Sequence, residues 1–202
     1  MELPQKNDKL FKAESSPDVG AWLKAPANKF FLYSEGYKSA GDTLFEHCIA
    51  NPFFNNSLVY PLIFTYRQFI ELKLKEIITM GNKLNEIAED FPDEHNILKL
   101  WKLFRYEIYP KITNEDKELF DNAEKILEQF HLEDPHSMNF RYPLTKGPVR
   151  RDSLNRDTID LKNLKEVIER LYNFLNSLWD EISHYQDMKD EMIQEYYSQN
   201  WY

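Results

Sequence analysis

The chain has 202 residues, a net charge of −9 and a single cysteine, Cys48. One cysteine excludes an internal disulfide and a thiolate zinc site, and the acidic balance argues against a surface that wraps duplex nucleic acid, because phosphate binding needs clustered Lys and Arg. No stretch approaches the roughly 20 apolar residues of a membrane span. We therefore expect a cytoplasmic protein that makes no contact with a membrane.

The spacing of apolar residues indicates the fold class. Only 5 residues are glycine, and apolar side chains recur every three or four positions rather than alternating, which is typical of helices rather than strands. We predict an all-α single domain, a bundle of about five helices with a long irregular loop before the last one. Residues 1–26 are expected to form a polar, partly disordered leader, residues 27–185 the bundle, and residues 186–202 a helical tail.

Two long helices are expected first. One covers residues 28–50, where apolar side chains form a single stripe. The next covers residues 58–80, with Pro61 in its first turn, where a missing N–H costs little, and Gly81-Asn82 as its end. Its apolar residues cover nearly the whole circumference: Leu62, Ile63, Phe64, Tyr66, Phe69, Ile70, Leu72, Leu74, Ile77 and Ile78. We expect this helix at the centre of the bundle, since such helices are surrounded by others.

Arg67 and Glu71 interrupt this apolar helix. Residues four apart lie on one helical face, so the two side chains can pair. A buried arginine–carboxylate pair is costly unless it is fully hydrogen-bonded, which makes it more informative here than on a surface. The pair is either a structural ion pair or part of a functional site.

The third helix is predicted over residues 95–109 with Asp93 as its N-cap, and the fourth over residues 114–130. His95 and Asn96 stand at the start of the third helix, where free N–H groups favour an anion. The pair is therefore a candidate for acid–base chemistry or for phosphate binding. The alternative is that His95 is an ordinary surface residue.

Residues 132–159 form the predicted irregular connection, and the final helix starts at Asp160 as its cap. His136 and Arg141 stand in a proline-bracketed stretch of this loop. Its second half is basic, with Arg141, Lys146, Arg150, Arg151 and Arg156 against the single acid Asp152. If Arg141 folds back toward Glu71 or His95, a phosphate pocket with two guanidiniums results. Otherwise Arg141 simply ties the loop to the bundle.

Several known chemistries have no motif in this chain. It lacks a glycine-rich phosphate loop, a His-Glu-x-x-His helix and the paired Glu-x-x-His of di-metal bundles, so we expect neither a metal nor a cofactor. The end of the chain is aromatic on a polar background, with Met188, Met192, Ile193, Tyr196, Tyr197, Trp201 and Tyr202. Such a tail is a frayed terminus or a segment that docks a partner.

Residues 66–75 (YRQFIELKLK), 95–101 (HNILKLW) and 140–143 (FRYP), with 33–37 (YSEGY) and Ala40 before them, resemble the HEPN superfamily. The similarity is greatest to prokaryotic HEPN-like proteins with a YR-x-x-IEL-x-LK helix, an HN-x-x-x-LW helix and an FRYP loop, and it spans about residues 28–185. It implies a four-to-five-helix bundle, often dimeric, of toxin–antitoxin, antiphage or other stress systems. Many such proteins are metal-independent ribonucleases that use an Arg followed four to six residues later by a His.

This chain departs from that motif, since no arginine precedes a histidine at that interval, and Arg170 and His184 are fourteen apart. One hypothesis is a module that acts on or binds RNA or nucleotide phosphate. In it Arg67, Glu71 and His95 carry the chemistry, and Arg141, Asn96 and His136 bind phosphate. The alternative is a non-catalytic structural or regulatory subunit that binds a protein partner. Both are compatible with a homodimer, and enzymatic activity stays open.

Overall fold

The computed structural model describes residues 3–12, 18–24, 28–88 and 92–200. In these ranges the chain is an all-α bundle of five α-helices, and its nearest approach to a strand is one isolated bridge between Leu144 and Asp152. The predicted fold class is therefore confirmed. Parts of the predicted leader, and Trp201 and Tyr202 of the predicted tail, lie outside the described residues.

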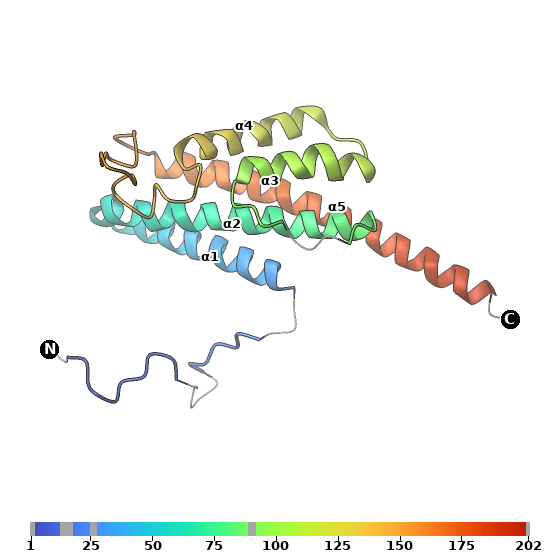
Figure 1. Ribbon diagram of the computed structural model, residues 1–202, viewed down its shortest axis with the longest axis horizontal. Coiled ribbons are helices and arrows are strands. Elements are labelled where there is room, and N and C mark those ends of the chain that lie inside the picture. Colours follow the sequence, from blue (N-terminus) through green and yellow to red (C-terminus); the bar gives the residue numbers. More distant parts are fainter. Residues whose placement is uncertain (1–2, 13–17, 25–27, 89–91, 201–202) are drawn as a thin grey trace.

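The first two helices, α1 (Lys29–Ala50) and α2 (Asn55–Leu84), lie side by side and antiparallel (Figure 1). Asn28 caps α1, because its side-chain oxygen accepts hydrogen bonds from the N–H groups of Phe30 and Phe31. A short 3₁₀ turn, Pro52–Phe54, connects the two helices. Helix α2 also packs against α3 and α5, and its buried residues face all directions. The predicted central position of this helix is confirmed.

The predicted ends of α2 were wrong by several residues. The helix begins at Asn55, so Pro61 lies inside it, and it continues past Gly81 to Leu84. A Cβ added at Gly81 would lie 2.6 Å from Cγ2 of Ile108. Glycine at this position therefore allows close packing against the segment after α3, and its occurrence near a helix end does not mark a stop.

Helix α3 (Ile97–Leu103) runs into a π-helical turn (Phe104–Ile108) and a 3₁₀ turn (Tyr109–Lys111), and α4 (Lys117–Glu133) follows. The N-cap of α3 is Asn96 and not the expected Asp93. The centre of the core is aromatic, since the Trp101 ring lies 5.5 Å from Phe120 and 5.8 Å from Phe174. Phe120 is buried, whereas its neighbour Leu119 is 46% exposed.

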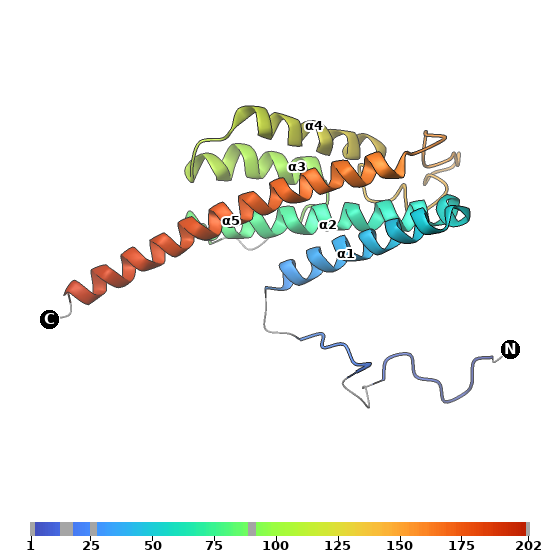
Figure 2. The same ribbon diagram turned by 180° about the vertical axis from the view of Figure 1, so that it is seen from behind.

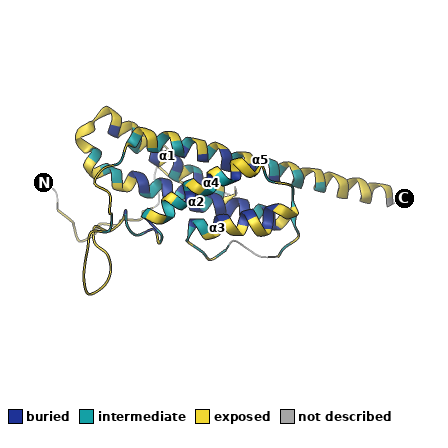
Figure 3. Ribbon diagram, turned by 90° about the horizontal axis from the view of Figure 1, so that it is seen from above, coloured by how far each residue is buried: buried dark blue, intermediate teal, exposed yellow. Residues whose placement is uncertain are grey.

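Helix α5 (Leu161–Asn200) starts where predicted, with Asp160 accepting hydrogen bonds from the N–H groups of Lys162 and Asn163. It runs along the bundle and continues beyond it, as Figures 1 and 2 show. Figure 3 shows that the projecting part is mostly exposed. Among the described helices, none combines the length and apolar character needed to cross a bilayer.

Candidate functional site

The sequence-predicted cluster of Arg67, Glu71 and His95 forms at the junction of α2 and the start of α3. The Arg67 guanidinium donates to Oε2 of Glu71 at 3.0 Å and to the backbone carbonyl of His95 at 2.5 Å. The second carboxylate oxygen of Glu71 lies 2.7 Å from Nδ1 of His95 and 3.4 Å from Nζ of Lys75. Glu71 thus holds three basic side chains around one buried carboxylate.

Arg67 is completely buried, and its Nε has no hydrogen-bond partner within the described chain. Its contacts lie inside the protein, so the expectation that Arg67 itself holds phosphate does not fit this geometry. The physical reason is that α2 is enclosed on all sides, and a guanidinium there has to pair internally. Arg67 instead positions the Glu71 carboxylate and the backbone at His95.

His95 differs from Arg67 because 70% of its side chain is exposed. A carboxylate on Nδ1 favours the tautomer with its proton on that nitrogen, which leaves Nε2 as a proton acceptor. A buried carboxylate that orients an exposed imidazole is the arrangement of a general acid–base pair. The chemistry available here is therefore proton transfer at the surface of the bundle.

Asn96 has a structural role in this conformation. Its side-chain oxygen accepts hydrogen bonds from the N–H groups of Leu98 and Lys99, both at 3.1 Å. The N–H groups of His95 and Asn96 donate to Oε1 of Glu94. The chain's own side chains thus occupy the backbone donors that we expected to bind phosphate, and the anion at this helix start is Glu94.

The loop after α4 is built around the buried carboxylate of Asp134. Its Oδ1 accepts hydrogen bonds from the N–H groups of Met138 and Asn139, at 2.6 and 3.0 Å. Ser153 closes the other side, since its one hydroxyl proton is shared between the carbonyls of Asn139 and Tyr142, at 2.9 and 2.6 Å. The loop is therefore irregular, as predicted, and is held by internal hydrogen bonds.

Arg141 does not join Glu71 or His95. Its guanidinium lies over the rings of Phe64 and Tyr142, 5.5 and 5.4 Å from their centroids. A second contact fixes the loop on α2, because Nε2 of Gln68 donates to the Ser137 hydroxyl at 2.9 Å. The alternative that Arg141 ties the loop to the bundle fits these contacts.

The loop and the His95 cluster nevertheless lie along the same side of α2. Phe64 contacts Arg141, Gln68 contacts Ser137, and Glu71 contacts His95. Positions four and then three apart fall on one helical face. At 1.5 Å per residue, the seven steps from Phe64 to Glu71 correspond to about 10 Å along the helix.

The loop also encloses a hollow of ≈ 720 Å³, a volume typical of small-molecule sites. Its lining includes His136, Tyr142, Lys146 and Arg150 together with apolar side chains such as Leu144. In the described part of the chain, no carboxylate lies within ion-pair distance of Lys146 or Arg150. Lys146 and Arg150 belong to the basic stretch noted in the sequence, but the hollow they line could not be read from it.

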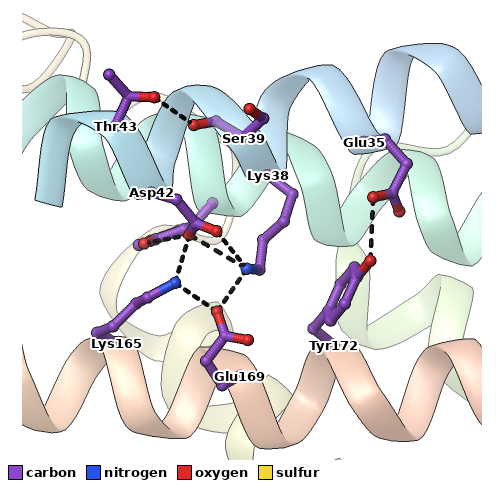
Figure 4. Close-up of polar contacts among 9 residues, drawn as sticks. Glu35, Lys38, Ser39, Asp42, Thr43, Lys165, Glu169 and Tyr172 are labelled. Carbon is purple, nitrogen blue, oxygen red and sulfur yellow. Dashed lines mark hydrogen bonds and ion pairs between the residues drawn. The ribbon is translucent and has the colours of Figure 1, made fainter. Parts of the chain in front are cut away.

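Sequence reasoning missed a cluster of charges between α1 and α5. Lys38, which is buried, donates to Asp42 and Glu169, and Lys165 donates to the same two carboxylates (Figure 4). Burial acts to raise the pKa of Asp42, but hydrogen bonds from Lys165, Lys38 and Tyr66 outweigh it, and the pKa is lowered. The network joins two helices that are far apart in sequence.

This lowered pKa predicts an acid-dependent loss of stability. A carboxyl whose pKa is lower in the folded state than its usual value of about 3.9 stabilises the fold above that value, and the contribution is lost as pH falls through the lowered pKa. We expect Asp42→Asn to lower the free energy of unfolding at pH 7 and to reduce its decline between pH 7 and pH 3, measured by urea denaturation. Asp187→Asn, on the projecting end of α5, is the control. Parallel declines for wild type and Asp42→Asn would contradict the prediction.

Two further buried charges have partners that local patterns do not reveal. Glu76 accepts hydrogen bonds from Asn28 and Trp179. Burial raises its pKa, and the nearby Lys73 only partly offsets this effect. Arg105, on the π-helical turn, binds Glu115, Asp121 and Glu124. The only signal in the sequence was a charged residue at an inward position of a helix.

No set of three or more His, Cys, Asp or Glu side chains is arranged to hold a metal ion within residues 3–12, 18–24, 28–88 and 92–200. Comparison with protein-family models, curated proteins and solved structures gave no match to this chain. The resemblance to HEPN proteins therefore stays a prediction.

Proposed function

We propose that this chain binds RNA or a nucleotide through its phosphate, at a surface formed by the loop of residues 134–156 and the exposed His95. In this proposal it is a HEPN-like module of a bacterial defence or toxin–antitoxin system. The observation that carries the proposal is a hollow of ≈ 720 Å³ whose lining includes Lys146, Arg150 and Tyr142, in a protein of net charge −9. We refer to this surface as the loop site.

The charge of the loop site supports an anionic ligand. Between residues 141 and 156 there are five basic side chains and one acid, although the chain as a whole is acidic. Arg156 is engaged by Glu133. In the described part of the chain Lys146 and Arg150 have no carboxylate within ion-pair distance, so these two are available to phosphate. Tyr142 is 48% exposed, and base stacking on aromatic rings contributes to single-strand binding. His136 lies in the same lining and fits its expected role as a phosphate contact.

The neighbouring Glu71–His95 pair supports a role in acid–base chemistry for a ligand held at the loop site. The two contacts that join the loop to α2, at Phe64 and Gln68, lie about two helical turns and one turn before Glu71. A chain of phosphates bound by the loop can thus extend toward His95. In this arrangement Arg67 is a positioning residue, because it acts through Glu71 and the His95 backbone.

A binding measurement tests the loop site. We expect Lys146→Glu/Arg150→Glu to weaken the binding of a fluorescently labelled single-stranded RNA by at least about tenfold, measured by anisotropy at low salt, because phosphate contacts dominate such affinity. Lys162→Glu/Arg170→Glu is the matched control, since it makes the same charge change on the exposed face of α5. Equal weakening by both variants would show a general charge effect and would contradict the loop site.

The second candidate is a non-catalytic subunit that binds a protein partner. It is favoured by the internal contacts of Arg67, which fit a structural ion pair as well as a positioning role. The two candidates differ in one measurement, since only the first requires the wild-type protein to bind RNA.

A further inference from the structure

A smaller hollow lies between α2, α4 and α5. It is at the end of the bundle that carries the loop, where α4 ends and α5 begins (Figure 1). Its volume is ≈ 240 Å³, and it shares no lining residue with the hollow that contains Lys146 and Arg150. The apolar part of its lining comes from all three helices and from the loop: Ile63, Ile126, Phe130, Phe140, Ile159, Leu164, Val167 and Ile168. We refer to it as the helix hollow.

The helix hollow reaches the hydrophobic core. Ile63 and Ile168 in its lining are 3% and 0% exposed, whereas Phe130, Leu164 and Val167 are only partly buried. Apolar pockets between the helices of a bundle are frequent sites for small ligands, and an apolar cavity of about 150 Å³ is enough to hold benzene. The helix hollow therefore has room for one phenyl ring with a short side chain.

The charged groups at the helix hollow are two carboxylates, Glu133 and Asp160, and one guanidinium, Arg156. Arg156 donates to Oε1 of Glu133, and Oδ1 of Asp160 accepts hydrogen bonds from the N–H groups of Lys162 and Asn163. The other oxygen of each carboxylate, Oε2 of Glu133 and Oδ2 of Asp160, has no hydrogen-bond partner in the part of the chain that the structure describes. Two carboxylate oxygens thus remain for a ligand.

These contacts favour a cation over an anion. An anion would need a free guanidinium or free backbone N–H groups, but Arg156 is paired with Glu133 and Asp160 already occupies the first N–H groups of α5. The two carboxylates and one guanidinium give the lining a net charge of −1. An ammonium group has three N–H donors and no acceptor, so it can donate to both free carboxylate oxygens.

We propose that the helix hollow binds a small primary amine with an apolar body of about the size of a phenethyl group. The body packs against core side chains such as Ile63 and Ile168, and its burial supplies most of the affinity. The ammonium group donates to Glu133 and Asp160, and these charge-assisted hydrogen bonds select the amine against neutral and anionic ligands with the same body. The inference does not depend on RNA binding, so the two can fail separately.

Isothermal titration calorimetry of the full chain tests this inference with three probes that share one phenethyl body. Phenethylamine has a cationic head, phenethyl alcohol a neutral one and phenylpropanoate an anionic one. We expect phenethylamine to bind the wild type with a Kd of about 0.1–1 mM, because a ligand of so few atoms has limited affinity. The alcohol should bind at least about threefold more weakly, because it lacks the charge. The anion should not bind detectably.

Glu133→Gln/Asp160→Asn removes both charges and keeps the cap of α5, since asparagine caps a helix as well as aspartate does. In this variant phenethylamine should bind no better than the alcohol. The matched control is Asp116→Asn/Glu128→Gln, which makes the same two changes at the N-cap of α4 and at a residue of α4 outside the hollow. This control should bind phenethylamine like the wild type. Val167→Phe places a ring in the hollow and should weaken the binding of both probes by at least about tenfold.

Melting curves without ligand, followed by circular dichroism, check that each variant is folded. A wild type that does not bind phenethylamine at about 10 mM, well above the expected Kd, overturns the proposal. So does a wild type that binds phenylpropanoate as tightly as phenethylamine, or a Glu133→Gln/Asp160→Asn variant that loses no more affinity than the control. Unchanged binding by Val167→Phe would place the amine outside the helix hollow and would contradict the proposal as well.

Discussion

Replacement of Arg67 by methionine is expected to lower the free energy of unfolding by about 3–5 kcal/mol, the usual cost when one partner of a buried ion pair is removed. Methionine fills much of the space of the arginine stem, so the change removes the charge more than the volume. The carboxylate of Glu71, which is only 4% exposed, then keeps Lys75 and His95 but loses its buried partner. Urea denaturation measures the difference.

The double variant Arg67→Met/Glu71→Leu separates charge from packing. Replacing a whole buried ion pair by apolar residues is often neutral or stabilising, so we expect the double variant to be more stable than Arg67→Met alone. An Arg67→Met protein within about 1 kcal/mol of wild type would show that the pair is not the structural element proposed here. The result also tests Arg67 as a positioning residue, because the Arg67 guanidinium donates to the backbone carbonyl of His95.

Replacement of His95 by alanine is expected to lower any RNA cleavage by about 10²–10⁴-fold, the range for loss of a general acid or base. The substitution keeps the backbone carbonyl that binds Arg67, and the His95 side chain is mostly exposed, so stability should change little. Cleavage of total RNA or tRNA, followed over time on denaturing gels, is the measurement.

His184→Ala is the matched control, because His184 is also exposed but lies on α5. Its cleavage rate should equal that of the wild type. Undiminished cleavage by His95→Ala would remove His95 from the proposed chemistry. A wild type that binds RNA without cutting it would leave the loop site in place as a binding surface and would favour a non-catalytic module.

The sequence predicted the elements of the fold more closely than their ends. The apolar residues between positions 62 and 78 lie on nearly all faces of their helix, so its central position followed from the pattern alone. Asp160 was also predicted correctly as a cap, because capping involves only neighbouring residues. Gly81 shows the limit of such reasoning. A glycine near a helix end signals a stop by local rules, but its close approach to Ile108 is a tertiary contact.

The candidate site was predicted in part. Four-residue spacing placed Arg67 and Glu71 together, and the pair forms as expected. The hypothesis also placed His95 beside this pair, and Nδ1 of His95 does lie next to the Glu71 carboxylate. Arg141, which the hypothesis placed there as well, stacks on Phe64 and Tyr142 instead. Spacing along one helix fixes which side chains are neighbours. It does not fix where a long loop folds back, because that depends on contacts such as Gln68 with Ser137.

The sequence by itself thus determined the all-α class, the central helix, the Arg67–Glu71 pair and the start of α5 at Asp160, because each depends on residues a few positions apart. Tertiary structure alone decided which other charges are enclosed and which of them pair between helices. Lys38 and Glu169 are 131 positions apart, and Arg105 draws its three carboxylates from α4 and the segment before it. The physical reason is that a buried charge needs a partner. When the partner comes from another helix, its identity depends on how the helices lie against one another.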